Sequence, residues 1–156
     1  MYSEFRREHP IVGAGAAAAL NMSGHHMGVV GDFGSNVQLE NGLFLQTIDT
    51  WAEFINHKEI SLCNNASELY FEEADMNVFI AKLQEAQIEY VHGLIEHSWG
   101  QRAVRFYDPD HHIIEVAEEI SMVIKRFCES GLSEEEVAVR MDVPVEYIKE
   151  CMQGKS

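Results

Sequence analysis

The stretch that decides the fold is His97–Glu119, which reads HSWGQRAVRFYDPDHHIIEVAEE. In Ala103–Tyr107 the odd-numbered residues alternate with Val104 and Phe106, and in Ile113–Ala117 they alternate with Ile114 and Val116. A period of two is that of a β-strand. The connection Asp108–His112 carries Pro109 between two aspartates, a composition typical of a turn. The sequence therefore predicts a β-hairpin here.

Glu115 lies in the second strand of this hairpin, on the predicted face of Ile113 and Ala117. A carboxylate is costly to bury unless another group pairs with it. Two readings follow. If the face lines a cavity, a metal ion or a substrate proton is the expected partner; if it faces water, Glu115 is an ordinary surface residue.

The segment WGQRAVRFYDPDHHIIEV resembles the closing hairpin of the vicinal oxygen chelate superfamily, which includes glyoxalase I, bleomycin-resistance proteins, fosfomycin-resistance enzymes and extradiol dioxygenases. The resemblance is strong over about residues 66–119, fair over 29–46 and poor over the first 28. It implies an α+β fold in which two βαβββ modules form an open half-barrel. His111 stands where the family usually has Gly, at a position that needs a positive φ.

The predicted domain covers residues 1–119, with modules at about 1–48 and 66–119. Strands of the first module are expected at 8–12, 27–33, 36–40 and 43–48, with the Asn41-Gly42 pair as a hairpin turn. Gly13–Leu20 departs from the family because it is almost all Gly and Ala and has no strong apolar stripe. The second module is expected to contain strands at 68–72 and 88–91, a helix capped by Asp75, and the hairpin.

Residues 120–156 are predicted to form a helical extension. Helices are expected at 120–128, at 134–141 after a capping box of Ser133 and Glu136, and at 145–152 with Pro144 in first position. These short helices resemble a helix-turn-helix, but the third contains only Lys149 as a cation. We therefore interpret the extension as a packing or dimerisation element.

The composition restricts the possible partners. The formal net charge is −15, from 26 Asp and Glu against 11 Lys and Arg, which opposes binding to nucleic acid or to an anionic membrane. No apolar run is long enough to span a membrane. Three widely spaced cysteines indicate neither a disulfide framework nor a zinc site, so a cytoplasmic location is expected.

The resemblance also implies a set of metal ligands, at His9, Gln46, Glu68 and Glu115. Such donors suit a divalent Ni, Co, Mn, Zn or Fe ion that retains waters. The implied function is that of a metal-dependent lyase or isomerase for a small oxygenated molecule, with Glu115 as the base that moves a proton. The alternatives are a metal-free small-molecule binding protein of the bleomycin-resistance type and a ligand-sensing regulator. A homodimer is expected in each case, and each predicted ligand also has an ordinary reading as a solvated side chain.

Overall fold

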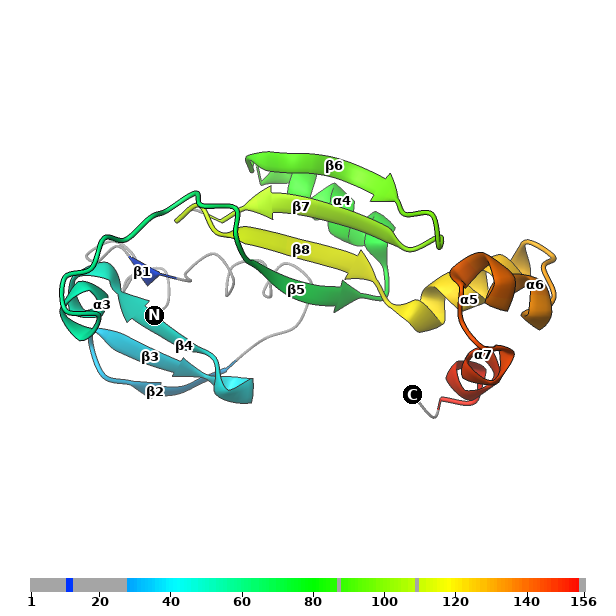
Figure 1. Ribbon diagram of the computed structural model, residues 1–156, viewed down its shortest axis with the longest axis horizontal. Helices are drawn as coiled ribbons and strands as arrows, with labels where there is room; N and C mark the ends of the chain where they lie inside the picture. The colour runs from blue at the N-terminus through cyan, green and yellow to red at the C-terminus, as the bar shows by residue number, and fades with distance from the viewer. Residues whose placement is uncertain (1–10, 13–27, 87, 109, 155–156) are drawn as a thin grey trace.

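The described part of the chain before residue 120 contains two four-stranded β-sheets (Figure 1). The computed structural model describes residues 11–12, 28–86, 88–108 and 110–154. The first sheet has the order β1-β4-β3-β2 and is antiparallel throughout. Its strands are β1 (Ile11–Val12), β2 (Val29–Asp32), β3 (Asn36–Leu39) and β4 (Phe44–Thr47). The Asn-Gly pair lies in the 3-10 turn η1 (Glu40–Gly42), which joins β3 to β4 as predicted.

The second sheet has the order β5-β8-β7-β6 and contains the predicted hairpin. Its strands are β5 (Glu68–Glu73), β6 (Tyr90–Glu96), β7 (Arg102–Tyr107) and β8 (Ile113–Glu118). β5 runs parallel to β8, and the other two pairs are antiparallel. His111 has a φ of 60°, which confirms the expected positive φ in the turn. β6 extends well beyond the predicted 88–91, because its pairing with β7 continues past His92 and Gly93 to Glu96.

One face of the second sheet is covered by helix α4 (Met76–Glu85). Asp75 caps this helix as predicted, since its side chain accepts a hydrogen bond from the backbone N–H of Val78. The helix and the sheet bury one apolar cluster, made of Met76, Phe79, Leu83, Val104, Phe106, Ile114 and Val116. Leu43, which precedes β4, packs against the same cluster and so joins the first module to the second. The opposite face of the sheet is not covered by α4, and we refer to it as the open face.

The described chain after β8 is helical, as predicted (Figure 1). It contains α5 (Ile120–Glu129), α6 (Glu134–Met141) and α7 (Val145–Met152), and a shorter helix, α3 (Ile48–Phe54), follows β4. The capping box of Ser133 and Glu136 is confirmed. Pro144 is the residue before α7 and not its first, because its ψ of 144° is extended. The three helices bury a second apolar cluster, made of Val123, Ile124, Phe127, Val137, Ala138, Met141, Ile148 and Cys151.

The α+β class with two separate sheets and no closed barrel in the described chain confirms the predicted fold class. The helix expected in the first module falls in residues 13–27, outside the described residues, and so does His9. The described residues contain no helix of the length and apolarity needed to cross a membrane.

Candidate functional site

Side chains on the open face form a row across the second sheet. Strand pairing sets His92 on β6 opposite Arg105 on β7, and Arg105 opposite Glu115 on β8. The row continues to β5, where Tyr70 is the partner of Glu115. Glu68 is two residues before Tyr70 and therefore shares its face. Four strands thus bring two carboxylates, one guanidinium and one imidazole to the same place.

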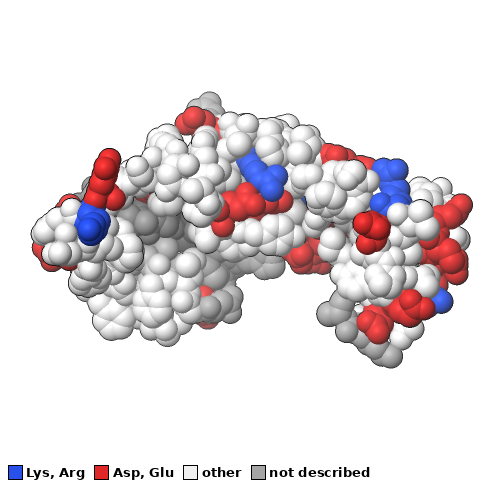
Figure 2. Space-filling model, in the orientation of Figure 1, with Lys and Arg blue, Asp and Glu red and all other residues white. Residues whose placement is uncertain are grey.

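Arg105 is the centre of this cluster. Its Nε lies 2.8 Å from a carboxylate oxygen of Glu68, and its terminal nitrogen Nη2 donates to Glu115. The other terminal nitrogen, Nη1, lies 3.2 Å from Nε2 of His92. A guanidinium only donates, so Nε2 must accept and the proton of the His92 ring sits on Nδ1, which is 2.8 Å from the carbonyl oxygen of Gly93. Basic and acidic side chains lie together near the middle of this face (Figure 2).

The environment shifts the pKa values of the two carboxyl groups in opposite directions. Glu115 is only 6% exposed, and burial together with a hydrogen bond to Glu68 raises its pKa to about 7 despite the nearby Arg105. The pKa of Glu68 is lowered, chiefly by its hydrogen bond from Arg105. The pair therefore retains a proton on Glu115 under conditions in which Glu68 is ionised.

Two exposed aromatic side chains flank the cluster. Tyr70 is 48% exposed and Trp99, in the loop between β6 and β7, is 39% exposed. Both are held by the buried amide of Gln101, which accepts from the Trp99 indole at 3.2 Å and donates to the Tyr70 hydroxyl at 3.1 Å. The Tyr70 hydroxyl donates in turn to Glu72 at 3.0 Å. On the other side, the ring of His97 stacks on Trp99 with the centroids 4.3 Å apart.

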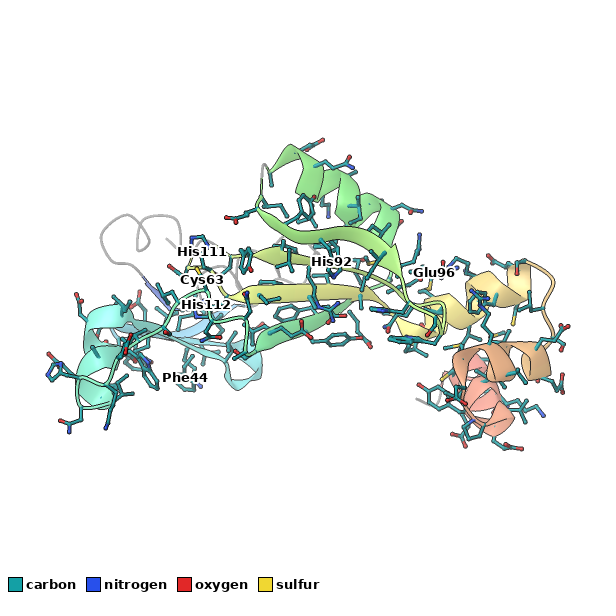
Figure 3. All side chains as sticks on the ribbon, turned by 45° about the horizontal axis from the view of Figure 1, so that its top comes forward. Phe44, Cys63, His92, Glu96, His111 and His112 are labelled. Carbon is teal, nitrogen blue, oxygen red and sulfur yellow. The ribbon has the colours of Figure 1, made fainter. Side chains whose placement is uncertain are left out.

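A second group of ion pairs attaches the helical extension to the end of the sheet. Glu118 is buried and accepts from Arg102 at 2.7 Å and from Arg126 of α5 at 2.9 Å. Glu96, at the end of β6 nearest the extension, pairs with Arg126 and with Arg140 of α6 (Figure 3). Each charged side chain in this group has a partner within the group. We therefore conclude that these ion pairs hold the helices against the sheet and are not part of the site.

The described members of the predicted metal-ligand set lie in two different places in the structure. Glu68 and Glu115 lie together as expected, but both are bonded to Arg105. Gln46 lies on the first sheet, where its amide accepts from Asn36 at 2.6 Å and donates to Thr50. Among the described residues, no three His, Cys, Asp or Glu side chains are grouped so that they could hold a metal ion. As arranged, the described donors therefore do not fit a divalent ion, and the four-ligand set stays a prediction.

The sequence analysis did not place several members of the cluster beside Glu68 and Glu115. The position of Arg105 was readable, because a hairpin that pairs Tyr107 with Ile113 also pairs Arg105 with Glu115. Tyr70 was readable too, since it alternates with Leu69 and so shares the face of Glu68. No sequence pattern indicated that His92 and Gln101 would lie in the cluster. They reach the site through contacts with residues distant in the sequence.

Comparisons with known proteins agree with this architecture. A protein of unknown function from Agrobacterium tumefaciens str. C58 is 31% identical, over 68% of this chain and 83% of that one, with a TM-score of 0.56. A glyoxalase-related enzyme from Fulvimarina pelagi matches with a TM-score of 0.53 at 17% identity, over 67% of this chain and 78% of that one, which supports the fold alone. The curated proteins include no match. The family model described as a glyoxalase-like domain matches residues 25–121, and the chain therefore belongs to the glyoxalase-like family.

Proposed function

We propose that this chain is a small-molecule-binding protein whose ligand lies on the open face of the second sheet. The observation that carries the proposal is the pair Tyr70 and Trp99, which are well exposed and yet fixed by the same buried amide of Gln101. Exposed aromatic rings are usually free to rotate, whereas these two are held in one arrangement beside a charged cluster. Such preorganisation lowers the entropic cost of binding a ligand.

The chemistry of the surrounding groups favours a particular kind of ligand. Tyr70 and Trp99 offer ring surface on which a flat apolar group can pack. Glu68 and Glu72, on the same face of β5, offer carboxylate oxygens, which only accept hydrogen bonds when ionised. We therefore expect a small molecule that combines a ring with hydrogen-bond donors such as an amine.

Fluorescence of Trp99 gives a direct test. The chain has two tryptophans, so Trp51→Phe leaves Trp99 as the only indole. We expect benzylamine to change its emission in a saturable way, and benzoate to do so more weakly. Tyr70→Leu should weaken the benzylamine response at least tenfold, while the control Tyr90→Leu should not, because Tyr90 is also exposed but pairs with Phe106 and so belongs to the α4 face. A response to neither probe, or equal losses in both variants, contradicts the proposal.

A second candidate is the lyase or isomerase reaction that the family resemblance implies, with Glu115 as the group that moves the proton. The observation that favours it is the raised pKa of Glu115, about 7, because a group with this pKa exchanges protons readily at neutral pH. The test is exchange of solvent deuterium into the methylglyoxal–glutathione adduct, after addition of Ni, Co, Mn, Zn or Fe. Loss of exchange in Glu115→Gln, with exchange retained in Glu119→Gln, would favour this candidate over simple binding.

A homodimer and a cytoplasmic location also remain proposals. Support for the dimer comes from β6, the edge strand of the second sheet, on which Val91, Leu94 and Ile95 are each 41% exposed. An exposed apolar edge strand is a common site of association between chains.

A further inference from the structure

We propose that the outer face of helix α6 is a docking surface for a basic amphipathic segment of a partner protein. The surface combines the exposed side chain of Val139 with the carboxylates of Glu135 and Asp142. The inference goes beyond the proposed function and does not rest on it, because α6 belongs to the helical extension and not to the open face of the second sheet. The match to the glyoxalase-like family ends at residue 121, so α6 also lies outside the matched region.

The first argument is the apolar surface on the outer face of α6. The inner face of this helix packs into the second apolar cluster, but Val139 does not. Its exposed fraction of 82% is the largest of any large apolar side chain in the described chain. Two hollows meet at Val139, one lined also by Leu132 and the other by Val143 and Val145. An apolar groove therefore crosses this face without a covering element.

The second argument is the charge along the groove. Glu135 lines both hollows and Asp142 lines the second. Among the described residues, neither carboxylate has an ion-pair or hydrogen-bond partner. Arg140 is the one described cation in the lining, and it already pairs with Glu96. Acidic side chains gather on the end of the molecule that carries α6 and α7 (Figure 2). Isolated surface carboxylates are ordinarily solvated, whereas these two border apolar surface.

The charge selects the occupant of the groove. A helix that lies in an apolar groove inserts side chains spaced three and four residues apart, and the charges beside them choose the partner. A partner segment with apolar residues on one face and Lys or Arg beside them would match both features. A second copy of this chain is opposed, because it would set the same carboxylates against one another and each chain has a net charge of −15. The same charge opposes nucleic acid.

The test is fluorescence anisotropy with the full chain at physiological salt, which screens the long-range attraction of any cation to an acidic protein. The probe is a fluorescein-labelled synthetic peptide of two LKKLLKL repeats, which places Leu on one helix face and Lys on the other. The control peptide has two LEELLEL repeats, with the same apolar pattern and the opposite charge. We expect saturable binding of the Lys peptide, and binding of the Glu peptide at least about tenfold more weakly.

Two variants locate the binding on α6. Val139→Ser removes the exposed methyl groups and Glu135→Lys reverses the charge beside them, and both positions are exposed, so the fold should be unchanged. Each variant should weaken binding of the Lys peptide about five- to tenfold. The matched controls on α4 are Val78→Ser and Glu85→Lys, because both of these positions are exposed as well. Neither control should change the affinity by more than about twofold, since the groove is intact in both.

Three outcomes would overturn the inference. The first is a Lys peptide that does not bind, or a Glu peptide that binds equally well. The second is an equal loss in the α6 and α4 variants, because the peptide would then respond only to net charge. The third is a wild-type dimer in sedimentation that both Val139→Ser and Glu135→Lys dissociate, because a second copy would then occupy the groove. Trp99 fluorescence with benzylamine tests the proposed function separately, and Val139→Ser should leave that response unchanged.

Discussion

As the pH rises from 5 to 8, the difference in unfolding free energy between Glu115→Gln and the wild type should shift in favour of the variant. The folded protein holds the pKa of Glu115 at about 7, above its ordinary value of 4.5. Between these values the folded state binds a proton that the unfolded state has released, so the contribution of Glu115 is fully present below pH 4.5 and is lost as the pH rises to 7. At about 1.4 kcal/mol for each unit of pKa, the wild type loses about 2–3 kcal/mol more than the variant between pH 5 and pH 8.

The assay is urea unfolding at several pH values, followed by the fluorescence of Trp99 in a Trp51→Phe background so that the signal reports the second sheet. Glu118→Gln is the matched control, because it is also a buried glutamate of β8. Its pKa is lowered by the hydrogen bonds from Arg102 and Arg126, which outweigh the effect of burial. We expect this control to be destabilised by about 3 kcal/mol at every pH from 5 to 8, since the loss of one partner of a buried ion pair leaves the others uncompensated.

The difference in unfolding free energy between Glu115→Gln and the wild type must therefore change with pH. Groups such as His112, whose pKa is raised by its hydrogen bond to Asp108, titrate in both proteins and cancel in the difference. Parallel curves for the wild type and Glu115→Gln from pH 5 to pH 8 would refute the assignment of a retained proton to Glu115.

Two further predictions concern the backbone. Gly100 has a φ of 92°, and a Cβ there would lie 2.1 Å from the Phe127 ring. Gly100→Ala should therefore destabilise the protein by about 2–4 kcal/mol in a urea titration. The control is Gly131→Ala, which has a φ of 99° but open space around the added Cβ and should cost only about 1–2 kcal/mol. His111→Gly should stabilise the protein by about 0.5–1 kcal/mol, because the residue has a φ of 60° and Gly adopts this conformation without strain. A lower urea midpoint for His111→Gly would contradict this reasoning.

The parts of the fold that the sequence could predict are those encoded by local patterns. The hairpin of β7 and β8 could be predicted from its period of two and from Pro109. Helix α4 could be predicted from its apolar spacing and the Asp75 cap. The end of β6 was not readable, because His92 and Gly93 interrupt the apolar run and only the pairing with β7 carries the strand on to Glu96. Local pattern thus determined where elements exist, and pairing between strands determined where they end.

The candidate site was predictable only in part. Strand alternation placed Glu115 on the face of Ile113 and Ala117, as either a cavity-lining or a solvated residue, and the family resemblance grouped it with Glu68. Neither showed that Arg105 lies between them, although the symmetry of the hairpin already set Arg105 opposite Glu115. The link from Gln101 to Tyr70 spans 31 residues and depends on how the loop after β6 turns back over the sheet, which no local pattern describes.

The two separate apolar clusters have a consequence for the cooperativity of unfolding. One lies between α4 and the second sheet and the other among α5, α6 and α7, and they share no residue. Ion pairs centred on Glu118 and Glu96 connect the helices to the sheet, and such pairs weaken as salt is added. Regions joined mainly by polar contacts can open as separate cooperative units. Calorimetry in high salt should therefore resolve two heat-absorption peaks, while in low salt the ion pairs should merge them toward a single transition.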